Sequence, residues 1–261
     1  MQRPAQDGSD ATSGGRREPP RAIIFDAGNT LLRMNYPVIS QHLTGRGQRL
    51  TAEQVEEAEL RARVRLDRDL APGSSTESGG SQGRYLRYLL TYLGITDESE
   101  VQAIARWRRG YNLPVGLWNQ ADPGARGVLV RVKAAGLVAG VISNSNGSVR
   151  SALETAGLAE HLDFVVDSSE VGVEKPHPRI FEIGLAKAGV PAAAAVYIGD
   201  LYSVDVLGAR GAGLEGILLD PRGFWGSRDC RVARTLSDAV TLVLGEAKPH
   251  PHPGPLKNHV P

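Results

Sequence analysis

Short apolar runs and stretches with helical spacing alternate along most of this chain. The first run, Ala22 to Phe25, is rich in β-forming residues and ends at Asp26, where Gly28 and Asn29 stop the strand. After residue 123 the pattern predicts helices at 123–135, 148–156, 178–188, 203–212 and 237–244, and strands at 138–142, 162–166, 194–198 and 215–219. Alternating strands and helices favour a parallel sheet with helices on both faces. The expected fold class is therefore α/β, with a doubly wound parallel sheet.

A long helical segment interrupts this pattern directly after the first strand. Apolar residues recur every three or four positions from 36 to 70, and two more helical patterns follow the polar loop 71–81. We therefore expect a core of residues 22–33 and 119–247, with an inserted all-helical domain at 34–118. The polar ends, 1–21 and 248–261, have little to bury and are expected to be disordered tails.

Composition limits the range of functions. The net charge of +1 implies no polyanionic partner such as a nucleic acid, and the single cysteine, Cys230, excludes an intramolecular disulfide and a cysteine-based zinc cluster. No apolar run approaches the roughly 18 residues of a membrane helix, and the N-terminal segment lacks the apolar core of a signal peptide. These features predict a soluble, cytoplasmic protein without a membrane partner.

Polar residues follow each of four successive predicted strands. These residues are Asp26, then Ser143 and Asn144, then Lys175, and finally Asp200 with Asp205 five positions on. Each has an ordinary structural explanation on its own, such as a helix cap or a solvated charge. In an open α/β sheet, however, ligands bind beyond the carboxyl ends of the strands, so we expect these side chains to meet in one crevice.

The chemistry of such a crevice is coherent. Asp26 and Asp200 would form an oxygen-rich site suited to magnesium. The polar groups of Ser143 and Asn144 and the Lys175 ammonium can hold a phosphoryl group, and Asp26 can attack in line as a nucleophile. Metal and lysine would then stabilise charge on the transferring oxygens.

Four motifs, in order, resemble the haloacid dehalogenase-like hydrolase superfamily over about residues 22–245. They are Asp26-Ala27-Gly28-Asn29-Thr30, the apolar strand ending in Ser143-Asn144, Lys175-Pro176-His177-Pro178, and Gly199-Asp200 through Asp205 followed by Gly208-Ala209. The resemblance implies a Rossmann-like core, and a helical cap that closes over the site and selects a small phosphorylated substrate molecule.

The resemblance also implies residue roles. Asp26 would form the covalent intermediate, while Ser143 and Lys175 would bind the transferring group. Asp26, the Gly28 carbonyl and Asp200 would hold Mg²⁺. Two further roles follow by the same resemblance: support of the metal shell or of Lys175 by Asp205, and a hydrogen bond from Asn144 to the substrate or to an adjacent loop.

One position departs from the family pattern. Phosphatases of this family usually carry a second Asp two residues after the nucleophile as general acid and base, and here that residue is Gly28. General acid–base catalysis contributes typically about 10² to 10⁴-fold, so we expect slow turnover of ordinary phosphate esters and less loss with good leaving groups.

Three alternatives to a magnesium-dependent phosphohydrolase or phosphotransferase follow from Gly28. A metal-independent dehalogenase also lacks the second Asp, although Asp200 argues against this alternative. A phosphonate-cleaving enzyme would need a cap lysine, and residues 34–118 contain none. The third is a weakly active relative that serves as a binding module.

Several other residues are expected to have structural roles. We expect His177 to lie at a helix start and Trp118 to pack at the hinge of the cap. Four cap arginines are candidates to contact an anionic substrate, but we expect them on exposed helix faces: Arg46, Arg61, Arg63 and Arg84.

Overall fold

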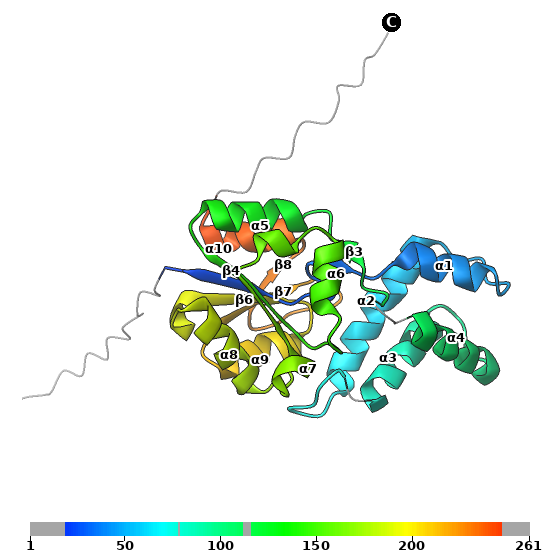
Figure 1. The fold of residues 1–261 in the computed structure, drawn as a ribbon. Helices are drawn as coiled ribbons and strands as arrows, with labels where there is room; N and C mark the ends of the chain where they lie inside the picture. Colours follow the sequence, from blue (N-terminus) through cyan, green and yellow to red (C-terminus); the bar gives the residue numbers. More distant parts are fainter. Residues whose placement is uncertain (1–18, 78, 112–115, 247–261) are drawn as a thin grey trace, which may run out of the picture.

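Six parallel strands form the centre of the computed structural model, which describes residues 19–77, 79–111 and 116–246 (Figure 1). The strand order is β5-β4-β1-β6-β7-β8, and every pairing in this sheet is parallel. The strands are β1 (Ala22–Phe25), β4 (Val138–Ser143), β5 (Phe164–Asp167), β6 (Ala195–Gly199), β7 (Glu215–Leu219) and β8 (Arg231–Ala233). The parallel sheet predicted from the sequence is confirmed.

Helices cover both faces of this sheet, as expected of a doubly wound fold (Figure 1). One face packs against α5 (Ala125–Ala134), α6 (Val149–Thr155) and α10 (Leu236–Leu244). The other face packs against α8 (Pro178–Ala188) and α9 (Leu207–Gly211). A single helical turn, α7 (Ser168–Val171), follows β5. Side chains alternate along β1. Ile23 and Phe25 pack on the face covered by α5, α6 and α10, while Ala22 and Ile24 pack on the face covered by α8 and α9. Because both faces of β1 are buried, its sequence is a continuous apolar run.

Four helices follow β1 in the chain, and they lie beside the sheet rather than on either face (Figure 1). They are α1 (Tyr36–Thr44), α2 (Ala52–Asp69), α3 (Gly79–Tyr92) and α4 (Glu98–Tyr111). α2 begins at Thr51, which forms a capping box with Gln54. These helices share a hydrophobic cluster of their own, centred on Leu43, Val55 and Leu90. We call them the cap helices.

A short antiparallel pair joins the two connections between the sheet and the cap helices. β2 (Leu32–Arg33) pairs with β3 (Gln120–Ala121), so the chain leaves and re-enters the core at neighbouring points. None of the helices in the described part of the chain is long and apolar enough to cross a lipid bilayer.

The structure adds elements that the pattern did not predict. β8 has no continuous apolar run, and β2 and β3 have two residues each. The helix expected at 203–212 starts as a π-helical turn, Tyr202–Val206, before α9 continues it. The predicted N-terminal tail falls largely outside the described residues, and the predicted C-terminal tail falls entirely outside them.

Candidate active site

The residues predicted at the strand ends meet at the carboxyl edge of the sheet. β1 lies between β4 and β6, so Asp26, Ser143 and Asp200 lie at the carboxyl ends of three adjacent strands. They line one cavity of about 280 Å³ together with Lys175 and Asp205. Residues from the cap helices and from the loop before α3 line the same cavity. The crevice inferred from the sequence is therefore present, and the cap helices close part of it.

Lys175 is the cation at the centre of this site. Its Nζ donates to Asp26 Oδ1 at 2.6 Å, to Asp205 Oδ1 at 2.8 Å and to the Tyr197 hydroxyl at 2.9 Å, and the residue is only 2% exposed. Burial works against the charged ammonium, but the attraction of Asp205 and Asp26 keeps the pKa of Lys175 well above its usual value. Lys175 is therefore a fixed positive charge beside the Asp26 carboxylate.

Asp26 itself is 8% exposed and faces the cavity. Burial raises its pKa from 3.8 to about 6, against the opposing attraction of Lys175. The carboxylate is thus largely desolvated but still faces the cavity, and its geometry suits a nucleophile oriented by an adjacent cation.

Asp205 is held by the main chain as well as by Lys175. Its Oδ2 accepts from the backbone N–H groups of Asp200 at 3.1 Å and Leu201 at 2.9 Å. A Cβ on Gly199 would lie 2.4 Å from Asp205 Cγ, so only glycine allows this close approach. The π-helical turn Tyr202–Val206 carries Asp205 to this point. These contacts make Asp205 a support for Lys175 and for the loop after β6.

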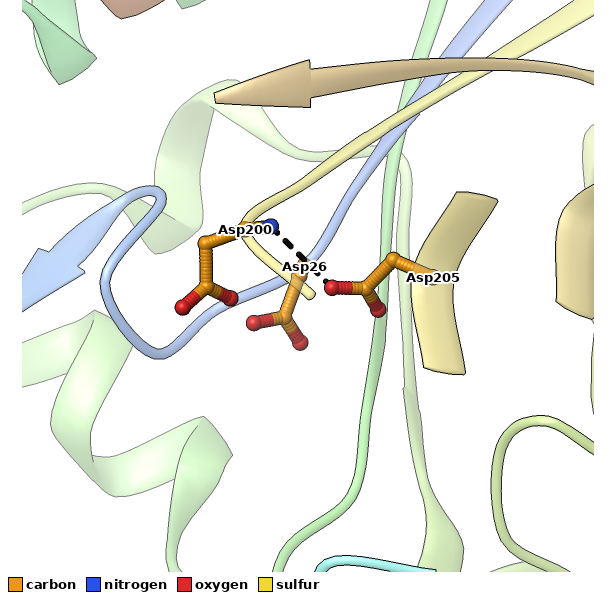
Figure 2. Close-up of side chains that lie close together, drawn as sticks. All are labelled: Asp26, Asp200 and Asp205. Atoms are coloured by element: carbon orange, nitrogen blue, oxygen red, sulfur yellow. Dashed lines mark hydrogen bonds between the residues drawn. The ribbon is translucent and has the colours of Figure 1, made fainter. Parts of the chain in front are cut away.

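Asp26, Asp200 and Asp205 each offer a carboxylate oxygen within 4.8 Å of the others (Figure 2). Burial raises the pKa of Asp200 well above its usual value, although Arg63 opposes this effect. Asp200 Oδ2 accepts from Arg63, whereas Oδ1 has no hydrogen-bond donor among the described residues.

The charge balance of the site fits a divalent cation. When all groups are ionised, two cations face four buried carboxylates, which leaves a formal charge of −2; the groups are Lys175 and Arg63 against Asp26, Asp200, Asp205 and Glu59. Hard divalent cations such as Mg²⁺ prefer carboxylate and carbonyl oxygens. Asp26, Asp200 and Gly28, which also lines the cavity, are the residues suited to hold one.

Ser143 and Asn144 differ in what their side chains contact. The Ser143 hydroxyl lines the cavity and makes one long hydrogen bond, of 3.4 Å, to the Asn144 carbonyl. The Asn144 amide bridges to the backbone of Lys175, donating to its carbonyl at 3.0 Å and accepting from its N–H at 2.7 Å. Asn144 thus makes the adjacent-loop contact considered from the sequence, and the hydroxyl of Ser143 remains available to a ligand.

The space beside Gly28 is covered by an indole ring. A Cβ at Gly28 would lie 3.4 Å from Trp118 Cδ1, and Trp118 Nε1 donates to Asn29 Oδ1 at 3.1 Å. Asn29 adopts a left-handed backbone conformation with φ 55°, which asparagine tolerates better than most residues. Trp118 therefore lines the site directly, beyond the hinge role expected of it.

An ion-pair network from α2 reaches Asp200 and was missed by the sequence analysis. Arg63 Nη1 donates to Asp200 Oδ2 at 2.8 Å, Arg63 Nε donates to Glu59 Oε1 at 3.0 Å, and Arg63 Nη2 pairs with Glu59 Oε2. Glu59 is fully buried and also accepts from the hydroxyls of Tyr36 at 3.1 Å and Tyr85 at 2.8 Å. Burial raises the pKa of both phenols, so both remain donors.

The expected exposure of Arg63 is therefore wrong. Arg63 is 5% exposed, because α2 crosses the carboxyl edge of the sheet with the face that carries Glu59 and Arg63 directed at Asp200. Their spacing of four residues and the apolar neighbours Leu60, Ala62 and Val64 were the available signal.

The other assignments hold. Arg46 and Arg61 form surface ion pairs with Glu100 and Glu57. His177 is the N-cap of α8, where its Nδ1 accepts from the N–H of Arg179 at 3.1 Å. Arg84, exposed on α3, donates to the Asp69 carbonyl at 3.2 Å.

With this geometry in place, comparison with known proteins decides the family. The model of the haloacid dehalogenase-like hydrolase family matches residues 20–213. This chain belongs to that family. Haloacid dehalogenase-like hydrolase domain-containing protein 3 of Danio rerio is 30% identical over 212 residues, which cover 78% of this chain and 86% of that protein. The family match supports a hydrolase.

Two further comparisons involve a phosphatase and a dehalogenase. Phosphoserine phosphatase of Thermus thermophilus is 36% identical over 151 residues, 56% of each chain. A crystal structure of a dehalogenase with an intermediate complex superposes with a TM-score of 0.59 at 20% identity, covering 86% of this chain and 97% of that one. The second likeness shows a shared fold.

Proposed function

We propose that this protein is a magnesium-dependent phosphohydrolase or phosphotransferase that acts on a small phosphorylated metabolite through Asp26. The observation that carries the proposal is the buried carboxylate cluster at the cavity, with its formal charge of −2 and with Lys175 Nζ 2.6 Å from Asp26 Oδ1. A phosphatase among the relatives supports the same activity.

The residues of this chain have distinct roles in the proposed reaction. Lys175 orients the Asp26 carboxylate and, with the Ser143 hydroxyl, binds oxygens of the phosphoryl group. Asp26 Oδ attacks phosphorus and forms a phosphoaspartyl group while the bond from phosphorus to the leaving oxygen breaks. Water then attacks the same phosphorus and releases phosphate and the Asp26 carboxylate.

Asp26, Asp200 and the Gly28 carbonyl would hold the metal in this proposal. Bound magnesium supplies positive charge to the phosphoryl oxygens and offsets repulsion between the substrate and the carboxylates. Asp205 keeps Lys175 in place, and Arg63 holds one oxygen of Asp200 from the cap side.

The test is turnover of acetyl phosphate and p-nitrophenyl phosphate by the purified protein, with and without magnesium, beside Asp26→Asn. The proposal predicts magnesium-dependent release of phosphate that Asp26→Asn abolishes. An unchanged rate in Asp26→Asn, or in the presence of a chelator, would rule the proposal out. Halide release from a 2-haloacid without metal would instead establish the dehalogenase alternative.

A further inference from the structure

The proposed reaction lacks a proton donor at the usual position. Gly28 has no side chain, and Trp118 lies against it. An alkoxide leaving group is a poor one, so a phosphate ester of an alcohol needs a general acid near the leaving oxygen. This inference rests on the proposed function and asks which residue supplies that proton.

The cavity offers one unassigned carboxylate. Among the described residues that line it, the carboxylates are Asp26, Asp200, Asp205 and Glu77, and no histidine is present. Asp205 is bonded to Lys175, and Asp26 and Asp200 belong to the cation site. Glu77, in the loop between α2 and α3, is the remaining acidic group.

The loop that carries Glu77 is attached to the core of the site. Ser75 Oγ accepts from the Glu77 N–H at 3.0 Å and from Asn144 Nδ2 at 3.4 Å, so the loop contacts the same Asn144 that holds the backbone of Lys175. Gln82 Nε2 donates to Glu77 Oε2 at 3.0 Å, and Oε1 has no hydrogen-bond donor among the described residues. One carboxyl oxygen of Glu77 is thus anchored and the other is available to a ligand.

The surroundings of Glu77 suit a group that alternates between acid and base. Burial raises its pKa above the usual value for glutamate, and Glu174 raises it further, while the hydrogen bond from Gln82 and the charges of Arg108 and Lys175 act in the opposite direction. A raised pKa increases the protonated fraction of a carboxyl group near neutral pH.

We propose that Glu77 is the general acid and base of this enzyme, supplied by the cap side of the cavity in place of the side chain absent at Gly28. As Asp26 attacks phosphorus, the Glu77 carboxyl proton moves to the leaving oxygen, which departs as a neutral alcohol. The Glu77 carboxylate then accepts a proton from the water that attacks the phosphoaspartyl group. Phosphate leaves, Asp26 is restored as a carboxylate, and Glu77 is again protonated.

The experiment compares Glu77→Gln with the wild type in rapid-mixing kinetics on p-nitrophenyl phosphate and on an alkyl phosphate. Nitrophenolate leaves without a proton, so we expect Glu77→Gln to release about one p-nitrophenol per enzyme in a rapid burst, followed by slow turnover as the phosphoenzyme accumulates. With the alkyl ester, phosphorylation of Asp26 should slow by about 10²-fold or more, without a burst. Glu57→Gln, on the exposed face of α2, is the matched control and should behave as the wild type.

Each other outcome overturns a defined part of the inference. Wild-type kinetics in Glu77→Gln, or equal slowing of the phosphorylation step with both esters, would show that Glu77 does not transfer the proton. If Glu77→Gln does not fold, Glu77→Ala and Glu77→Asp take its place. For each, the phosphorylation rate with the alkyl ester is divided by the rate with p-nitrophenyl phosphate and compared with the wild-type ratio. Failure of the proposed function is distinct, because the wild type would then show no magnesium-dependent turnover of the aryl ester.

Discussion

At the scale of single residues, burial makes the ionised form of Asp26 unfavourable. Its pKa rises from 3.8 in an unfolded chain to about 6 in the folded metal-free protein, because burial penalises the ionised form. Between these two values the folded state binds more protons than the unfolded state, so the free energy of unfolding falls as pH rises from about 4 to about 6. The loss amounts to up to about 3 kcal/mol.

This pH dependence is measured by urea unfolding in the presence of a chelator, for the wild type and for Asp26→Asn. We expect Asp26→Asn to gain stability relative to the wild type as pH rises through this window. A constant difference between the two proteins would contradict the assignment of the raised pKa to Asp26.

The glycine at position 28 permits a second prediction. The structure leaves room for a Cβ at Gly28 but places the Trp118 ring against it, so the carboxyl group of Gly28→Asp would meet the indole. We expect Gly28→Asp alone to raise the rate on an alkyl phosphate by less than about 10-fold, and Gly28→Asp with Trp118→Ala to give a larger gain than the two changes added separately. The rates are measured by steady-state kinetics. If the effects of the two substitutions on the rate simply add, Trp118 does not restrict the carboxyl group placed at position 28.

Residues at strand ends were predictable from the sequence because the sheet itself brings them together. Asp26, Ser143 and Asp200 each directly follow or end an apolar run, and the edge where parallel strands end gathers such residues. Arg63 and Glu77 were not predictable in the same way. Their positions depend on how the cap helices pack over the sheet, and helical spacing alone does not fix that packing.

At the scale of elements, Arg63 ties α2 to the core, because it pairs with Glu59 on the same helix and with Asp200 after β6. Removing the cation in Arg63→Met leaves Glu59 buried without its partner, which typically costs about 3–5 kcal/mol of stability. The double variant Glu59→Gln with Arg63→Met leaves no unpaired charge on α2, so it should lose less than the single variant. Chemical unfolding measures the stability of the single variants and of the double variant. A double variant whose loss of stability equals the sum of the losses in Arg63→Met and Glu59→Gln would contradict a stabilising pair.

A second prediction at this scale concerns the contact between β4 and β5. A Cβ on Gly140 would lie 2.1 Å from Phe164 Cζ, so Gly140→Ala forces the ring to move and should destabilise the protein by about 1–3 kcal/mol. Gly127 is exposed on α5, and a Cβ there meets no atom within 4 Å. Gly127→Ala is therefore the control, expected to stabilise by up to about 1 kcal/mol. Thermal unfolding of both variants tests the sign of each change.

The elements also show where sequence patterns suffice. The parallel strands β4, β5, β6 and β7 were predictable from their apolar runs, and α5, α6, α8 and α9 from the helical spacing between those runs. The single turn α7 was not predicted, because four residues are too few to show a helical period. β8 was not, since its residues Arg231–Ala233 form no apolar run and the strand is defined by pairing with β7 at the edge of the sheet.

At the scale of the whole molecule, the cap helices and the sheet share one cavity. The sheet edge supplies the nucleophile, the lysine and the carboxylates, and the cap side supplies Arg63, Tyr85 and Glu77. Contacts of Asp67 on α2 with the N–H and hydroxyl of Ser203, at 2.9 and 2.7 Å, join the two parts at a further point. We therefore expect substrate selection and catalysis to depend on both parts of the chain.

The central claim is that Asp26 is the nucleophile of a phosphoryl transfer. The most direct measurement is acid quenching of a single turnover with acetyl phosphate and magnesium, followed by peptide mapping by mass spectrometry. We expect a transient phosphoryl group on the peptide that contains Asp26, sensitive to hydroxylamine and absent from Asp26→Asn. Turnover without a phosphorylated peptide at any quench time, or with the phosphoryl group on another residue, would contradict the claim.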